Sequence, residues 1–394
     1  MKIRVLVGFV AVTQCAPTLA YGQASEIAAL RAEVAALTSR LVALESRQDD
    51  VEIAPTPPAA PGAVEGFKLK ADFRYRHNTI DEAGLERRDR HRIRARIGIS
   101  GDVAEDVEVG FRLSSGGINP VSGNQDLDTG FSRKSIGIDL AYFKWKFNDQ
   151  LTVSGGKIQN PFYRAGGNGM IWDGDLNPEG LALAIGGGAL SASVAGLWVE
   201  ERSGGSDSMM LGAQLTYAAA LGSGAKLKLG GSYFDYLQAQ GSTPFLNGSG
   251  AGNLLDINGN YPTDFNELEL FAELSTELGD QPLALFVDYV TNTEATNFDT
   301  GWAVGAKYGK ASDPGTWEAG YTYRDLEANA VVGTFSDSDF GGGGTDGSGH
   351  IIRAGYALNK KMKLALTYFL NERGADAGNR RDYDRLQLDM NFKY

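Results

Sequence analysis

Apolar and polar residues alternate along segment after segment of this chain, from Phe67 to its last residue. In the first segment Leu69 and Phe73 fall on one face of an extended strand, and Lys68 and Lys70 fall on the other. Successive side chains of a strand point to opposite faces of a sheet, whereas a helix repeats every 3.6 residues. A sustained period of two therefore predicts an all-β structure for residues 67–394.

Sixteen segments of this region have the length and pattern of strands. Two of them, 135–147 and 190–200, change phase internally, so we expect β-bulges or shifted ends there. The predicted strands are residues 67–77, 90–100, 107–115, 135–147, 151–158, 181–187, 190–200, 208–219, 225–236, 265–276, 283–291, 300–309, 315–325, 349–358, 361–371 and 382–394.

The connections between these strands alternate between short and long. An up-and-down barrel of the outer-membrane type has short turns at one end and longer loops at the other. The long connections are rich in Gly, Ser, Asn and Asp, which predicts mobile, solvated loops for 237–264 and 326–348 in particular. The long connections are residues 78–89, 116–134, 159–180, 201–207, 237–264, 292–299, 326–348 and 372–381.

The polar face of the strands carries Arg, Lys and Glu on one strand after another, while Tyr and Trp lie near strand ends of the apolar face. A soluble sandwich or propeller would bury its apolar face and expose this charge, and no blade-length repeat is present. A lipid-facing apolar surface requires a closed barrel, because lipid offers no partner to an open strand edge. We therefore predict a transmembrane antiparallel β-barrel of about 16 strands, preceded by a short coiled-coil helix.

Residues 1–24 have the pattern of a secretory signal peptide. Lys2 and Arg4 precede a short apolar stretch, and cleavage after Ala20 or Ala24 both fit. The one Cys of the chain, Cys15, lies in this segment, so the exported part needs no disulfide. The apolar stretch is too short for a membrane-spanning helix.

The sequence pattern of residues 25–51 predicts an amphipathic helix with a narrow apolar seam. The composition of residues 52–66 predicts a proline-rich linker. A helix this short needs a partner, either other copies of the chain or its own globular part; we favour oligomerisation, and the residues do not distinguish a dimer from a trimer. The seam residues are Ile27, Leu30, Val34, Leu37, Leu41 and Leu44.

The polar face of the first three strands is strongly basic, although the chain as a whole has a net charge of −12. In a barrel this face lines the lumen, where such a cluster requires either anions or facing carboxylates. The alternative is that these arginines form structural ion pairs that do not affect selectivity. The predicted basic lining residues are Lys68, Lys70, Arg74, Arg76, Arg90, Arg92, Arg94, Arg96 and Arg112.

Four stretches resemble the bacterial "putative porin" family: Arg90–Ser100, Val109–Gly116, Asn160–Phe162 and Trp172–Gly180. The resemblance implies an outer-membrane channel for passive diffusion of small hydrophilic solutes that is trimeric like the general porins. We expect no cofactor or metal, and we expect the N-terminal helix to lie in the periplasm. The C-terminal aromatic residues Phe392 and Tyr394 match the signal that barrels present to the outer-membrane assembly machinery.

In general porins the connection after the fifth strand folds into the channel and narrows it. The resemblance therefore implies that residues 159–180 form a constriction loop facing the basic residues, with a transverse field between them. The residues we expect to form this constriction are Arg164, Trp172, Asp173, Asp175 and Glu179.

Other functions fit the residues less well. A hydrolase needs a nucleophile beside a base, and His77, His91 and His350 lie in no such arrangement; the same three residues lack metal-ligand spacing. A TonB-dependent transporter needs a plug domain and more strands. An envelope-tethering role for the helix remains an alternative, and the acidic composition disfavours nucleic acid.

Two acidic groups have no clear role from the sequence. Glu267, Glu269 and Glu273 form an acidic stripe, which would either oppose the basic wall or sit behind a loop. For Asp337, Asp339 and Asp346, calcium binding is possible, but a flexible acidic loop is favoured.

Overall fold

The computed structural model describes residues 32–40, 66–246 and 248–394, which belong to two units, Met1–Glu65 and Gly66–Tyr394. In the first unit residues 32–40 are helical, within the predicted coiled-coil segment, and Val34 and Leu37 are exposed. No helix within the described ranges is long and apolar enough to cross a bilayer. Outside the described residues lie the signal peptide, linker residues 52–65, and the seam residues Ile27, Leu30, Leu41 and Leu44.

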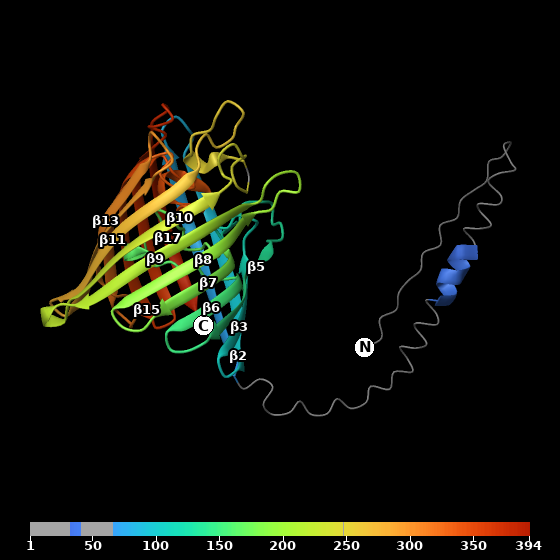
Figure 1. Cartoon of the computed structure of the whole chain (residues 1–394), viewed down its shortest axis with the longest axis horizontal. Coiled ribbons are helices and arrows are strands. Elements are labelled where there is room, and N and C mark those ends of the chain that lie inside the picture. The colour runs from blue at the N-terminus through green and yellow to red at the C-terminus, as the bar shows by residue number, and fades with distance from the viewer. Residues whose placement is uncertain (1–31, 41–65, 247) are drawn as a thin grey trace. The chain divides into compact units, whose positions relative to one another are not determined.

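The second unit is an antiparallel sheet of 17 strands (Figure 1). One of them, β4, has 2 residues and pairs beside β2, and the other 16 close into a barrel because β1 pairs with both β2 and β17. The strands are β1 (Lys68–Glu82), β2 (Arg88–Ala104), β3 (Val107–Ser115), β4 (Gln125–Asp126), β5 (Ile136–Lys146), β6 (Leu151–Lys157), β7 (Glu179–Gly186), β8 (Leu190–Glu200), β9 (Ser208–Ala220), β10 (Lys226–Leu237), β11 (Phe265–Leu278), β12 (Gln281–Asn292), β13 (Thr300–Gly309), β14 (Trp317–Leu326), β15 (Gly347–Asn359), β16 (Met362–Arg373) and β17 (Arg381–Lys393).

All sixteen predicted barrel strands are present, and the predicted fold class is confirmed. The pairing register shifts between Arg112 and Leu113 where β3 meets β5, and between Trp198 and Glu200 where β8 meets β9. These are the two regions in which the sequence pattern changes phase. The first connection is shorter than predicted, covering 83–87 instead of 78–89, because β1 and β2 extend beyond the alternating part of their sequences.

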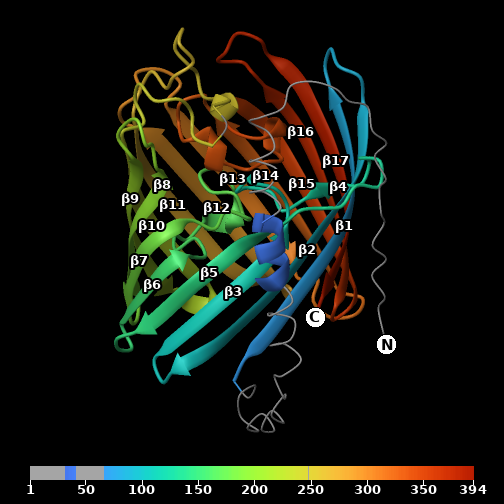
Figure 2. The same cartoon turned by 90° about the vertical axis from the view of Figure 1, so that its right-hand side faces the viewer.

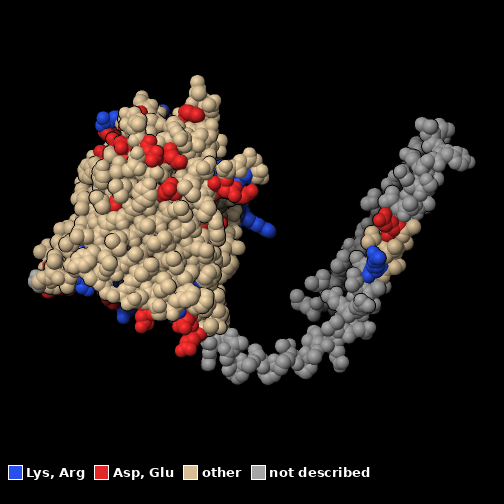
Figure 3. Space-filling model, in the orientation of Figure 1, with Lys and Arg blue, Asp and Glu red and all other residues tan. Residues whose placement is uncertain are grey.

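The apolar face of the strands points outward. Leu270 on β11 is 58% exposed, whereas its neighbours Glu267 and Glu269 are 0% and 3% exposed on the inner side. Charged side chains gather toward the two ends of the barrel, and the middle of the face shown in Figure 3 is nearly free of them. This is the surface that a lipid bilayer requires.

Three long connections, 158–178, 238–264 and 327–346, fold into the barrel (Figure 2). They contain the short helices η1 (Ala165–Gly167), η3 (Gly250–Gly252), η4 (Gly333–Phe335) and η5 (Phe340–Gly342), and a further short helix, η2 (Gly222–Gly224), lies in the turn between β9 and β10. The prediction of solvated loops is therefore wrong for 326–348, where nearly all residues are buried or half-buried, and holds only for part of 237–264, where Ile257 is fully exposed. Scattered apolar side chains such as Phe245, Tyr261 and Val331 are buried there, because the Gly-rich backbone packs closely against the barrel's interior.

Candidate pore constriction

The predicted basic residues lie on the inner face of β1, β2 and β3. We call the set Arg74, Arg76, Arg90, Arg92, Arg94, Arg96 and Arg112 the arginine stripe. In the β1–β2 register Arg74 lies opposite Arg94, and Arg76 lies opposite Arg92. Like charges directly opposite each other destabilise a sheet, so the stripe requires counter-ions. Lys68, toward the short-turn end, is exposed, as is Lys70.

Carboxylates on neighbouring strands supply part of the counter-charge. Each binds an arginine Nε directly, a geometry that gives strong charge-assisted hydrogen bonds. The pairs are Arg76 with Asp389 at 2.7 Å, Arg92 with Asp126 at 2.5 Å, Arg96 with Asp72 at 2.9 Å and Arg112 with Asp139 at 2.6 Å.

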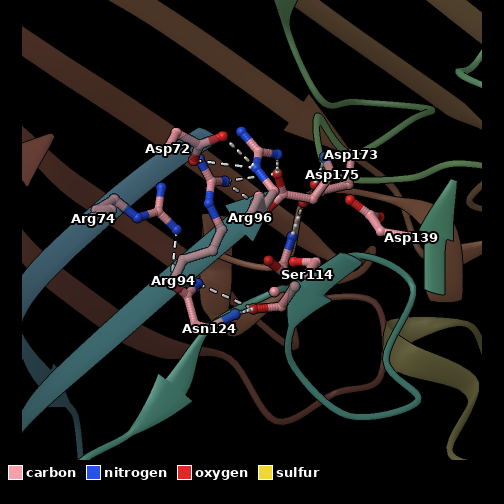
Figure 4. A network of polar contacts seen from close by, with 12 residues as sticks. Asp72, Arg74, Arg94, Arg96, Ser114, Asn124, Asp139, Asp173 and Asp175 are labelled. Carbon is pink, nitrogen blue, oxygen red and sulfur yellow. Dashed lines mark hydrogen bonds and ion pairs between the residues drawn. The ribbon is translucent and has the colours of Figure 1, made fainter. Parts of the chain in front are cut away.

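Connection 158–178 adds a carboxylate from inside the lumen. Asp175 Oδ1 lies 2.8 Å from Arg94 Nη1 and 3.3 Å from Arg96 Nη1 (Figure 4). Burial alone raises the pKa of Asp175, but Arg94 and Arg96 outweigh it and hold the pKa below its usual range. The connection is thus attached to the stripe by a direct contact, with no open gap between these charges for a transverse field.

Asp173, two residues earlier, faces a different partner. Its carboxylate Oδ2 accepts a hydrogen bond from the Ser338 backbone N–H at 3.0 Å, and its own N–H donates to the Phe335 carbonyl at 2.9 Å. Both partners belong to connection 327–346. Burial, with the nearby carboxylate of Asp337, raises the pKa of Asp173 to about 8. Asp173 therefore joins two inward connections and does not bind the stripe.

The other predicted constriction residues have separate positions. Trp172 is buried and packs edge-on against Phe234, with ring centroids 5.1 Å apart. Arg164 Nη1 donates to the Trp172 carbonyl at 2.9 Å, which holds the connection's own turn together. Glu179 is the first residue of β7 and pairs with Lys157 at 3.0 Å, so the structure does not bring it to the arginine stripe.

Connection 327–346 supplies a second loop carboxylate that the sequence analysis missed. Asp339 lies 3.0 Å from Arg76 Nη1 and 2.6 Å from Arg385 Nη2 on β17. On the same connection Asp337 lies 3.5 Å from Arg324 Nη2 on β14. The Asp-x-Asp spacing was visible in the sequence, but its partners are distant along the chain, and the flexible acidic loop that we favoured there is not what the structure shows.

The acidic stripe of β11 sits behind these connections. Glu267 Oε1 accepts the Val332 backbone N–H at 2.9 Å, and Glu273 Oε2 accepts the Tyr163 hydroxyl and the Gly166 N–H, each at 2.7 Å. Of the two alternatives for the acidic stripe, opposing the basic wall or sitting behind a loop, these contacts favour the second. Within the described part of the chain no His, Cys, Asp or Glu cluster is arranged to hold a metal ion.

An aromatic cluster fills the lumen on the side of β9 to β12. Its rings come from strands and from all three inward connections, and several lie stacked or edge-to-face. The arginine stripe lies away from this cluster, along β1, β2 and β3, whereas the acidic stripe shares β11 with it. The members of the cluster are Phe162, Trp172, Phe234, Tyr236, Phe245, Tyr261, Phe265 and Phe335.

The barrel wall is low on one side (Figure 2). β6 and β7 are 7 and 8 residues long, so the neighbouring ends of β5 and β8 have no partner strand between them. A cavity of about 790 Å³ occupies this notch. It is lined by Trp198 of β8 and by Arg96 and Asp175 of the lumen.

A closed 16-stranded barrel with an apolar exterior, and with charged connections folded into its lumen, defines an outer-membrane channel protein of the porin class. A family model described as "Putative porin" matches residues 81–253 and 253–394. The chain belongs to this family, which confirms the resemblance read from the sequence.

Solved porins share the fold. The high-pH structure of OprB from Pseudomonas putida is 13% identical, with 84% of this chain and 94% of that chain covered at a TM-score of 0.59. A mutant of the Rhodopseudomonas blastica porin is 12% identical, with 83% and 100% covered at a TM-score of 0.51. A search of curated proteins finds no match.

Proposed function

We propose that small hydrophilic solutes and ions diffuse passively through a water-filled path in the lumen, which connections 158–178 and 327–346 narrow where they attach to the arginine stripe. The observation that carries this proposal is the contact of Asp175 with Arg94 and Arg96, because it attaches an inward loop to a charged wall. Charges lining a channel set its selectivity, and the loops set its width.

Two measurements test this function. Purified protein in a planar bilayer should give stepwise, ohmic conductance, and liposomes containing it should swell in small sugars but not in large oligosaccharides. Protein denatured before reconstitution is the control. Intact barrels that insert without conductance or solute flux would contradict the proposal.

We infer that the protein assembles as a homotrimer through the low side of the wall and the N-terminal helix. Connection 116–135 lies beside this side and exposes Ile118 and Phe131, and the helix exposes Val34 and Leu37. Apolar side chains in such positions favour contact with other copies. Light scattering in detergent, corrected for the detergent, should give three chains per particle.

The two ends of the barrel support a proposal for the compartments on each side of the membrane. β1 begins and β17 finishes at the end that carries the short turns, which in outer-membrane barrels is the periplasmic end. We propose that the N-terminal helix lies in the periplasm and that the C-terminal aromatic residues are read by the barrel assembly machinery. A cysteine placed at Ser39 should resist impermeant thiol reagents in intact cells and react after the outer membrane is permeabilised.

A further inference from the structure

A second cavity, of about 250 Å³, lies in the mouth of the barrel at the end that carries the long connections. Its wall is formed by the ends of β1, β2, β16 and β17, and its floor by connection 327–346. The charged residues that line it are Glu82, Glu86, Arg88, Arg90, Arg92, Asp339, Arg373 and Arg385. Five guanidinium groups therefore face three carboxylates.

The charge in this cavity is less balanced than the count suggests. Asp339 is shared between Arg385 and Arg76. Glu82 lies 3.6 Å from Arg381, which does not line the cavity. Glu86 is left as the acidic residue that can offset the arginines inside it.

Three arginines of the cavity lack a close carboxylate. Arg90 lies 3.8 Å from Asp126, which Arg92 already holds at 2.5 Å. Arg88 makes no ion pair with any described residue, and within the same ranges neither does Arg373, whose guanidinium lies over the Tyr383 ring, 5.9 Å from its centroid. Lower in the stripe Arg94, Arg96 and Arg112 are all paired. Unpaired positive charge thus gathers at the mouth.

Hydrogen-bond donors are also unused at this end of the stripe. Arg90 Nε is buried and has no acceptor, and neither does the side-chain nitrogen of Asn78, which lies opposite Arg90 in the β1–β2 register. Buried donors are normally satisfied, so their combination with unpaired guanidinium groups indicates a missing acceptor. Guanidinium groups suit planar or tetrahedral oxygen acceptors, which they bind through two parallel hydrogen bonds.

We propose that this cavity is a binding site for a small oxyanion, a carboxylate or a phosphate, held by Arg88, Arg90 and Arg373 as it enters the channel. The inference rests on the proposed function, because it makes the solute of that channel anionic. The site concentrates anions at the mouth, ahead of the narrower part where the arginines are already neutralised by Asp72 and Asp175. Binding is electrostatic and weakens as salt is raised.

Two measurements distinguish anion binding at this site from conduction through the channel. Calorimetry on the intact detergent-solubilised protein at low salt uses orthophosphate and succinate in separate titrations, with glucose as the neutral control. Saturable heat with either anion, and none with glucose, is the expected result; the tighter of the two identifies the anion type. In planar bilayers the same anion, added at the side of the long connections, should give a current that saturates with concentration.

The double substitution Arg90→Gln with Arg373→Gln should weaken anion binding by about tenfold or more, as expected for loss of charge-assisted hydrogen bonds. Arg88→Gln, at an exposed position, should weaken it less and tests the site if the double variant assembles poorly. Arg87→Gln is the matched control, since Arg87 is 63% exposed and does not line the cavity.

The outcomes separate the two proposals. A channel that conducts but shows no saturable binding of either anion overturns the site and leaves the porin function standing. Equal affinities in the wild type and the double variant overturn it as well. Anion binding that the double variant loses, in a protein without conductance, supports the site and contradicts the channel.

Discussion

Asp339 lies between Arg385 on the last strand of the barrel and Arg76 on the first, at 2.6 Å and 3.0 Å. One residue of an inward connection thus bridges the line at which the sheet closes. Burial alone raises the pKa of Asp339, but Arg385 and Arg76 outweigh it and hold the pKa well below its usual range. The carboxylate therefore stays ionised at physiological pH and holds connection 327–346 inside the barrel.

Asp339→Asn should release this connection. Arg76 and Arg385 would keep their charge with one counter-ion fewer, and breaking a buried ion pair in this way costs about 3 kcal/mol. We expect a lower free energy of unfolding in urea and a larger single-channel conductance. Asp313→Asn, in the exposed turn between β13 and β14, is the control and should change neither. A conductance unchanged in Asp339→Asn would show that the connection does not narrow the path.

Replacing Arg92, Arg94 and Arg96 with Gln should shift ion selectivity toward cations. The substitutions leave Asp72 and Asp175 without an ion-pair partner and Asp126 with Arg90 at 3.8 Å, so the lumen becomes less basic by three charges. Reversal potentials across a salt gradient in planar bilayers measure the shift. Arg87→Gln removes the same kind of charge outside the lumen and should leave the potential unchanged. Identical potentials in the triple variant would mean that these arginines serve structure alone.

The contact between connections 158–178 and 327–346 should weaken at alkaline pH. The pKa of Asp173 is raised to about 8 by burial and by Asp337, so the folded protein favours its protonated form. Its contribution to stability is complete below about pH 4, the usual value for an Asp, and declines as pH rises until Asp173 ionises near pH 8. Arg164 and Asp175 are the other charged groups that face it.

We therefore expect single-channel conductance to rise between pH 7 and 9. Asp173→Asn, which imitates the neutral form, should remove that step while leaving the conductance near its neutral-pH value. A step of the same size in Asp173→Asn would assign the pH dependence to another group.

Deleting residues 25–51 should reduce the oligomer without unfolding the barrel. The strand pairing that closes the barrel involves residues 68–393, and no strand is contributed by the first unit within its described residues. Light scattering should show fewer chains per particle, while circular dichroism keeps its β signal. A deletion confined to 52–60 is the control, because it retains the helix. If trimers persist but the envelope detaches from the cell wall, the tethering role is favoured.

Tyr394→Ala should lower the yield of assembled barrel more than its stability. The Tyr394 side chain is 75% exposed, so its removal loses little packing, whereas its backbone N–H bond to Ala71 at 2.9 Å is retained. The test compares heat-resistant barrel in outer membranes with the stability of protein refolded in detergent. Tyr356→Ala, also exposed but in β15, is the control. Equal yields for both variants would remove Tyr394 from the assembly signal.

The strands were predictable because the period of two is a local property of the chain. Lys68 and Leu69 already separate the two faces, and lipid enforces the same separation on every strand. The inward connections were harder to predict. The position of 158–178 followed from the family resemblance, whereas nothing near Asp339 in the sequence identifies Arg76 or Arg385 as its partner.

Composition was misleading where a few apolar residues sit among many glycines. Connection 327–346 has the composition of a solvated loop, yet Val331 and Val332 are buried in the hydrophobic cluster inside the barrel. Glu179 was misplaced for a different reason. It lies within the stretch predicted to form the constriction, but it occupies one of the alternate positions of β7 that face outward. Strand parity near a loop boundary depends on where the strand begins, which the sequence places only within a few residues.

The position of Asp339 also constrains the order in which the barrel closes and connection 327–346 docks. Its two arginines come from opposite ends of the barrel sequence, so its docking place does not exist until the first and last strands have joined. Before that moment connection 327–346 can contact Glu267 on β11 and Arg324 on β14, but it has no attachment at the line where the sheet closes. The narrowing of the passage is thus a late event, completed when the cylinder is sealed.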